Sequence, residues 1–231
     1  MLKFEVIPVT PFAQNCSLVW CDETRQAALI DPGGETDKLL AAIARHDLVL
    51  EKIILTHGHL DHVGGADPLR EQSGVKIIGP HKEDAFWLDM LPQQSQMFGF
   101  PHTPAFSPDG WLAQGDKVTV GNCELEVYFC PGHTPGHVVL LSQAERLAWV
   151  GDVLFAGGIG RTDFPRGDHG TLIRSITETL LPLGDDIVFV PGHGPSSTFG
   201  RERVSNPYLT CLLYTSPSPR DATLSRMPSS A

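Results

Sequence analysis

One segment of ten residues constrains this chain more than any other: Thr56-His57-Gly58-His59-Leu60-Asp61-His62-Val63-Gly64-Gly65. It follows an apolar run at 53–55, which predicts a strand that ends where the segment begins. Because side chains alternate along extended chain, His57 and His59 point to the same side, and Asp61 and His62 follow at the turn. A bound cation explains best why three imidazoles and one carboxylate lie so close together. The segment therefore predicts a metal site at the tip of a strand.

Three later apolar runs also end in a histidine or a carboxylate. His133 follows Cys130-Pro131-Gly132, Asp152 follows Val150-Gly151, and His193 follows Val190-Pro191-Gly192. Glycine or proline beside each of them is typical of places where the backbone comes close to a bound group. The candidate metal ligands are therefore His57, His59, Asp61, His62, His133, Asp152 and His193. Among these, Asp61, His62 and Asp152 are also candidate catalytic residues.

The pattern of apolar residues predicts two clusters of strands, each followed by helices. Strands are expected at 3–9, 16–20, 26–31, 50–56, 76–78, 117–120, 123–129, 138–141, 147–150 and 186–190. Helices are expected at 35–46, 63–73, 81–91, 171–181 and 198–204, and residues 92–109 are expected to form a loop. This order predicts an α/β (α+β) fold in which two sheets pack face to face with helices outside, a four-layer αββα sandwich.

The length of 231 residues, with 41% hydrophobic and 19% charged residues, fits one large globular domain with a small appendage. We expect residues 1–209 to form that domain. Residues 210–231 are rich in Ser and Pro and have no periodicity, so we interpret them as a non-native or disordered tail.

The net charge of −10 argues against a nucleic-acid partner, because such proteins need a basic surface. The N-terminus shows no signal-peptide pattern, and no apolar run has the length of a membrane span. The five cysteines include no C-x-x-C pair, and their odd number suggests reduced thiols. We therefore expect a cytoplasmic protein without a membrane partner.

The H-x-H-x-D-H segment and its later partners resemble the metallo-β-lactamase superfamily over residues 3–209. The resemblance implies the metallo-β-lactamase fold. It also implies a first metal site made by His57, His59 and His133, and a second made by Asp61, His62 and His193. In this reading Asp152 bridges the two ions, and His137 is structural.

Within that superfamily the chain looks most like a short glyoxalase II-like, hydroxyacylglutathione hydrolase-like enzyme. The residues that carry this likeness are Asp31-Pro32-Gly33-Gly34, the run His133–His137, and Gly158–Phe164. The implied reaction is attack of a metal-bound hydroxide on the carbonyl of a thioester of the S-2-hydroxyacylglutathione type, a small-molecule substrate. The nitrogen and oxygen ligands suit two divalent ions, zinc first, with iron or manganese as alternatives. Residues 3–209 are not expected to include the C-terminal helical domain of full-length glyoxalase II enzymes, so we expect hydrolysis with more support than glutathione specificity.

For several side chains near the predicted site, a role in substrate binding and a structural role are both open. Arg161, Phe164 and Arg166 are candidate substrate-binding residues, although both arginines can instead pair with Asp163 and Asp168. A set of aromatic and methionine side chains can line an apolar substrate channel or only hold the long loop to the protein: Phe86, Trp87, Met97, Phe98 and Phe100. Asp31 is expected to support the ligands or turn the chain rather than to bind metal directly.

Two other functions remain open at this stage. A persulfide dioxygenase of the same fold would hold one iron with His57, His133 and Asp152, and would leave Asp61, His62 and His193 without a metal. A metal-binding protein without catalysis is disfavoured, because structural zinc sites are closed and rich in cysteine.

Overall fold

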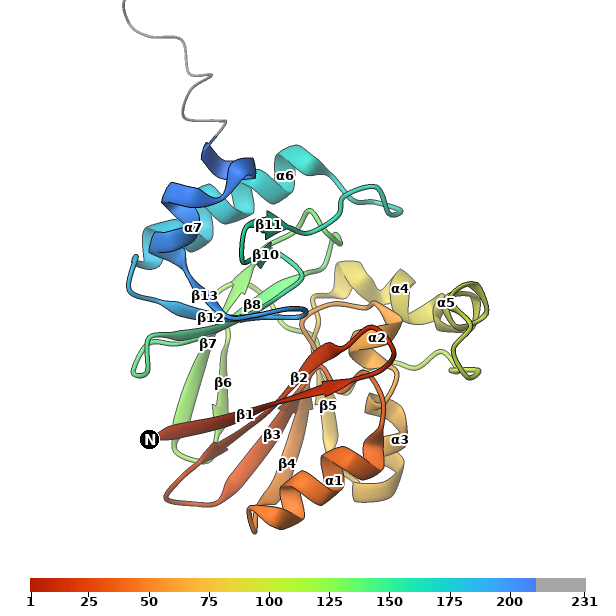
Figure 1. The fold of residues 1–231 in the computed structure, drawn as a ribbon. Coiled ribbons are helices and arrows are strands. Elements are labelled where there is room, and N and C mark those ends of the chain that lie inside the picture. Colours follow the sequence, from red (N-terminus) through yellow and green to blue (C-terminus); the bar gives the residue numbers. More distant parts are fainter. Residues whose placement is uncertain (211–231) are drawn as a thin grey trace, which may run out of the picture.

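The computed structural model describes residues 1–210. Except for Thr210, the predicted tail at 210–231 lies outside the described residues. Two β-sheets pack face to face, and helices cover the outer face of each (Figure 1). Among the described residues no helix is long and apolar enough to cross a membrane. The predicted four-layer αββα arrangement is confirmed.

The first sheet consists of five strands in sequence order. They are β1 (Leu2–Val9), β2 (Gln14–Cys21), β3 (Gln26–Ile30), β4 (Val49–Ile54) and β5 (Lys76–Ile78). Strands β1 to β3 are antiparallel, whereas β3, β4 and β5 run parallel. The two parallel connections contain α1 (Thr36–Arg45), and α2 (Leu60–Val63) with α3 (Ala66–Ser73).

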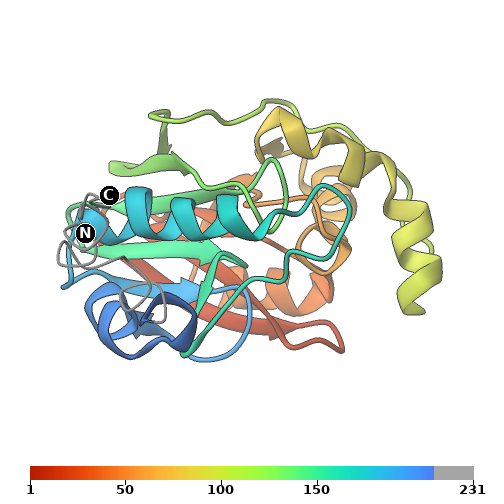
Figure 2. The same ribbon diagram turned by 90° about the horizontal axis from the view of Figure 1, so that it is seen from above.

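The second sheet has the order β13-β12-β9-β8-β7-β6. Its strands are β6 (Lys117–Val120), β7 (Cys123–Phe129), β8 (Val138–Ser142), β9 (Leu147–Gly151), β12 (Val188–Pro191) and β13 (Ser197–Thr198). Strand β12 runs parallel to β9. The helical segment between them consists of α6 (His169–Arg174), its π-helical continuation η2 (Ser175–Leu180) and the 3-10 helix η3 (Leu181–Leu183). Helix α6 and the last helix, α7 (Phe199–Ser205), lie over this sheet (Figure 2).

Three apolar clusters hold the four layers together, because both faces of each sheet are covered. On β3, Leu29 belongs to the cluster under α1 and α3, whereas Ile30 belongs to the cluster between the sheets. On β8, Leu140 faces the space between the sheets, and Leu141 packs in the cluster under α6 and α7. The alternation along each strand thus directs successive side chains into different cores.

The region after β5 differs from the sequence prediction. Residues 92–109 were predicted as a loop, but they begin with most of the helix α5 (Leu91–Phe98), which follows η1 (Lys82–Asp84) and α4 (Ala85–Asp89). Pro92 stands in the first turn of α5, where a missing N–H costs nothing, and Gly99 ends the helix with a left-handed φ of 69°. The loop prediction for this part of the chain was therefore wrong, because Pro92 and Gly99 lie at the two ends of a helix.

The predicted helix at 63–73 is also divided. It starts earlier, at Leu60, and breaks at Gly64-Gly65 between α2 and α3. A Cβ on Gly65 would lie 2.7 Å from the carbonyl oxygen of Pro32, so the close approach of these two segments requires glycine. The sequence prediction missed the short strands β10 (Leu154–Phe155), β11 (Gly158–Ile159) and β13.

Candidate metal centre

Four strand ends meet at one edge of the sandwich and deliver all the candidate ligands. The chain leaves β4 into His57 and β9 into Asp152, and it reaches His133 and His193 just after β7 and β12. The two sheets are joined at this edge, where the amide of Val138 donates to the carbonyl of Thr56 at 2.9 Å. Side chains more than 130 residues apart in the sequence therefore converge.

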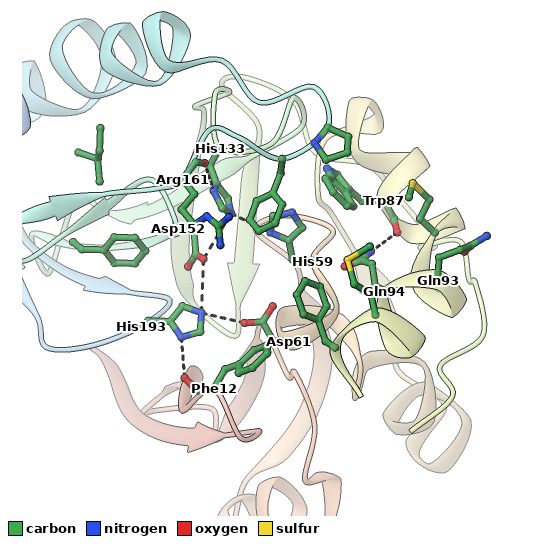
Figure 3. A pocket seen from close by; sticks show the side chains of 17 residues that line it. Phe12, His59, Asp61, Trp87, Gln93, Gln94, His133, Asp152, Arg161 and His193 are labelled. Atoms are coloured by element: carbon green, nitrogen blue, oxygen red, sulfur yellow. Dashed lines mark hydrogen bonds and ion pairs between the residues drawn. The ribbon is translucent and has the colours of Figure 1, made fainter. Parts of the chain in front are cut away.

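The candidate ligands form two adjoining groups. The ligand atoms of His57, His59 and His133 lie within 4.8 Å of one another, and so do those of Asp61, His62 and His193. Asp152 stands between the groups: its carboxylate oxygens lie 3.4 Å from His62 Nε2. They also lie 3.7 Å from Nε2 of both His133 and His193 (Figure 3). This is the arrangement expected for two ions that share one carboxylate.

Several buried polar atoms at this place have no hydrogen-bond partner among the described residues. Four of them belong to candidate ligands: the Nε2 atoms of His57, His59 and His62, and Oδ1 of Asp152. A buried polar atom without a partner is costly, and a bound cation would satisfy these four. A set of neutral imidazole nitrogens and carboxylate oxygens suits a divalent ion, so these residues fit a metal centre.

Hydrogen bonds from the far side of the rings fix the imidazoles. Asp31 is buried and accepts from Nδ1 of His62 at 2.9 Å and from the hydroxyl of Thr56 at 2.6 Å, and Oγ1 of Thr56 lies 3.0 Å from Nδ1 of His57. The Nδ1 of His133 donates to the carbonyl of Arg161 at 2.7 Å. Such partners leave Nε2 of each ring available for a metal. Asp31 therefore orients one histidine of each group.

Burial and neighbouring charges shift the pKa values of the candidate histidine ligands in opposite directions. Burial and the neighbouring imidazoles lower the pKa of His57 and His59 well below the usual range. Burial acts in the same direction on His62, but the carboxylates of Asp152 and Asp61 outweigh it and raise its pKa. Burial opposes ionisation of Asp152, but His62 and its neighbours hold the pKa of this carboxyl well below its ordinary value. The negative charge between the groups is thus maintained.

One residue of the site's support was missed in the sequence. Asp84, buried at the end of η1, accepts from the amide of Gly58 at 2.8 Å, the hydroxyl of Thr134 at 2.8 Å and the amide of Gly136 at 2.5 Å. It thereby ties the loop of His57 and His59 to the loop of His133. Burial raises the pKa of Asp84 to about 6, although its three donors act in the opposite direction. No local motif marks it.

A cavity of about 440 Å³ opens next to the candidate ligands. Its lining includes His59, Asp61, His133, Asp152 and His193 on one side. The remaining lining is mostly apolar and comes from the turn after β1, from α4 and α5, and from the segment after β9 (Figure 3). The centre is therefore open to a small molecule, which a structural metal site is not.

The candidate substrate-binding residues are placed differently from one another. Arg161 and Phe164 line the cavity, whereas Arg166 is not part of the lining and lies over the ring of Phe86 at 4.2 Å. Arg161 forms a bidentate pair with Asp163 at 2.8 and 2.9 Å. Of the aromatic and methionine set, Trp87, Met97 and Phe98 line the cavity, and Phe86 and Phe100 do not.

Comparison with known proteins agrees with this geometry. The family described as the metallo-beta-lactamase superfamily matches residues 9–193. The chain belongs to the metallo-β-lactamase superfamily. This membership and the His/Asp groups make the centre a site for divalent metal ions.

Relatives within the superfamily match the chain over most of its length. The hydroxyacylglutathione hydrolase GloC of Haemophilus influenzae is 51% identical over 209 residues, which are 90% of this chain and 98% of that protein. The crystal structure of the BLEG-1 B3 metallo-beta-lactamase superposes with a TM-score of 0.82 at 36% identity, covering 91% of this chain and all of the other. The structure of TTHA1623 in a di-iron-bound form gives 0.81 at 34% identity, covering 89% of this chain and 100% of that protein.

Proposed function

We propose that this protein hydrolyses thioesters of the S-2-hydroxyacylglutathione type at a centre of two divalent metal ions. The observation that carries the proposal is the pair of adjoining ligand groups with Asp152 between them, beside an open cavity. The high identity to a hydroxyacylglutathione hydrolase supports the choice of a thioester over other carbonyl compounds. A cytoplasmic location belongs to the same proposal, because glutathione chemistry is that of a reducing compartment.

The proposed ligands divide between the ions as the two groups suggest. His57, His59 and His133 would hold one ion, Asp61, His62 and His193 would hold the other, and Asp152, which lies between the two groups, would serve both. Zinc suits these ligands, and iron is the alternative to test, because a protein 34% identical to this one is described in a di-iron-bound form.

When bound, divalent ions at this place lower the pKa of a coordinated water to about 7 and polarise the carbonyl of the substrate. The protein side chains do the positioning. Asp31 keeps His62 in the tautomer whose Nε2 faces the centre, and the carbonyl of Phe12, 3.2 Å from Nδ1 of His193, accepts from that ring so that its Nε2 also faces the centre. A thiolate leaves as an anion, so the site does not need a separate acid for the leaving group.

The geometry favours a hydrolase over a persulfide dioxygenase with a single iron. That alternative uses His57, His133 and Asp152 and gives no role to Asp61, His62 and His193. These three side chains nevertheless gather their ligand atoms within 4.8 Å, and Asp31 orients His62 among them.

The test combines metal analysis with a substrate panel on one preparation. We expect about two metal ions per chain, hydrolysis of S-lactoylglutathione, and no oxygen uptake with glutathione persulfide. The variant His62→Ala should lose the second ion and most of the activity. Full activity of His62→Ala with one ion bound would refute the two-metal proposal, and oxygen uptake in place of hydrolysis would favour the dioxygenase.

A further inference from the structure

The apolar part of the cavity is built from side chains that are unusual on a protein surface. Phe12, from the turn between β1 and β2, is 45% exposed, and Met97 and Phe98 at the end of α5 are 73% and 41% exposed. All three line the cavity beside the candidate ligands. Large apolar side chains that gather at a cavity mouth mark a place where an apolar group binds.

The apolar wall of the cavity is made by segments that are distant in the sequence, and it continues to the candidate metal ligands. The rings of Phe12 and Phe98 meet edge to face at 6.0 Å, although the residues lie more than 80 positions apart. Further in, Trp87 packs edge to face on His59 at 4.5 Å, and Phe164 does so at 5.1 Å. An apolar surface thus leads from the mouth to a candidate metal ligand.

Apart from the candidate metal ligands, the lining offers little to a charged group. Arg161 is the one Lys or Arg among the described residues that line the cavity, and its guanidinium is held by Asp163 and lies over Phe164 at 4.5 Å. A thioester carbonyl at the ligands has the acyl group on one side and the thiol carrier on the other. Glutathione carries two carboxylates and one ammonium, so the apolar wall fits the acyl group better than the carrier.

We propose that this cavity selects thioesters with a bulky apolar acyl group, an aromatic ring or a chain of several methylenes, over the small hydroxylated lactoyl group. The assignment rests on the proposed hydrolase function for its chemistry, but its apolar recognition is measurable without any reaction. Phe12, Met97 and Phe98 are the residues that determine this specificity.

The first experiment measures binding of two stable thioethers, S-hexylglutathione and S-methylglutathione, to the purified protein by titration calorimetry. Each buried methylene improves the dissociation constant about fourfold, so we expect the hexyl compound to bind at least tenfold more tightly. This ratio should fall at least threefold in Phe12→Ala and in Phe98→Ala. Both rings are partly exposed, and the melting temperature of each variant shows whether it is folded.

The matched control is Val204→Ala on α7, another exposed apolar residue (73%) that is not part of the cavity lining. It should leave the hexyl-to-methyl ratio unchanged. Equal affinity of the wild-type protein for the two thioethers, or a ratio that neither phenylalanine variant changes, would overturn the proposal.

A second experiment separates this proposal from the proposed function. We expect kcat/KM to be higher for S-hexanoylglutathione than for S-lactoylglutathione, with a smaller ratio in Phe98→Ala. A lower value for the hexanoyl compound would count against apolar selection. Failure to hydrolyse either thioester, with the chain-length dependence of binding intact, would refute the hydrolase function and leave the apolar cavity assigned.

Discussion

At the scale of single residues, Asp31 shows how a side chain that is not itself among the proposed ligands can control the centre. Asp31→Asn keeps the shape, and Asn also tolerates the left-handed φ of 52° found there. The side-chain NH2 group of this variant would face one of two donors. These are the Nδ1–H of His62 and the backbone N–H of Thr56, which both donate to Asp31 in the wild type. The ring of His62 would then turn or change tautomer, and we expect metal affinity to fall about 10–100-fold.

Competition with a chelating dye measures this change in Asp31→Asn. The matched control is Asp37→Asn, an exposed carboxylate at the start of α1, which should bind metal like the wild type. Unchanged metal affinity in Asp31→Asn would show that the hydrogen bond to His62 does not position this ligand.

Asp84 leads to a prediction about pH. Its pKa in the folded protein, about 6, lies above the usual 3.8, so its contribution to stability is full below pH 3.8 and is lost as the pH rises through 6. Asp84→Asn removes this dependence of stability on pH. Its side-chain NH2 group would also face one of the three donors that bind Asp84, which lowers the free energy of unfolding by about 1–3 kcal/mol. The deficit of the variant, its loss in free energy of unfolding relative to the wild type, should therefore be larger at pH 5 than at pH 7.5 by about 1–2 kcal/mol.

Urea denaturation of the wild type and Asp84→Asn at both pH values measures the two deficits. Glu71→Gln, which changes an exposed carboxylate on α3 away from Asp84, should show neither effect. A deficit that is the same at both pH values would mean that Asp84 is already ionised at pH 5.

At the scale of elements, α5 is attached to the site through one buried amide. Gln94 accepts from the amide of Leu60 at 2.9 Å, at the start of α2, and donates to the carbonyl of Trp87 at 2.8 Å. Gln94→Ala leaves both backbone groups without this partner, so we expect a loss of about 1–3 kcal/mol in stability. Because α2 carries Asp61, hydrolytic activity should fall as well.

Gln96→Ala on the same helix is the control, because Gln96 is exposed and does not line the cavity. Thermal unfolding and kcat of the two variants are compared in parallel. If Gln94→Ala were as stable and active as Gln96→Ala, the link between α5 and α2 would have no energetic importance.

At the scale of the whole molecule, the centre connects the two sheets. Asp61 and His62 follow the first sheet's β4, whereas Asp152 and His193 follow strands of the second. Metal that binds only the folded state adds about 2.7 kcal/mol of stability at a concentration 100 times its dissociation constant. For a chain of this size, chelation should then lower the melting temperature by roughly 5–10 °C. Scanning calorimetry with and without chelator measures the shift, and added metal should reverse it; an unchanged melting temperature would contradict binding across the sheets.

Local sequence was sufficient to predict an element or a ligand position where the residues that determine it are neighbours in the chain. The strands β5, β6 and β7 have the predicted bounds, because a short apolar alternation and the Gly121-Asn122 turn define them locally. The same holds for the candidate ligands: each follows an apolar strand, so its place at a strand end could be inferred from its neighbours alone. Helix α5 was missed because its short, mostly polar sequence has a weak apolar pattern, although Pro92 and Gly99 stand where a helix begins and ends.

What the sequence by itself determined is therefore the two-sheet fold and the chemical character of one edge. Only the tertiary structure decided which side chains support that edge and what it can bind. Asp84 meets Gly136 across 52 positions, and Phe12 meets Phe98 only because the β1–β2 turn lies beside α5. Such contacts leave no periodic or local trace, since they depend on how separate segments pack and not on the order of residues within any one of them.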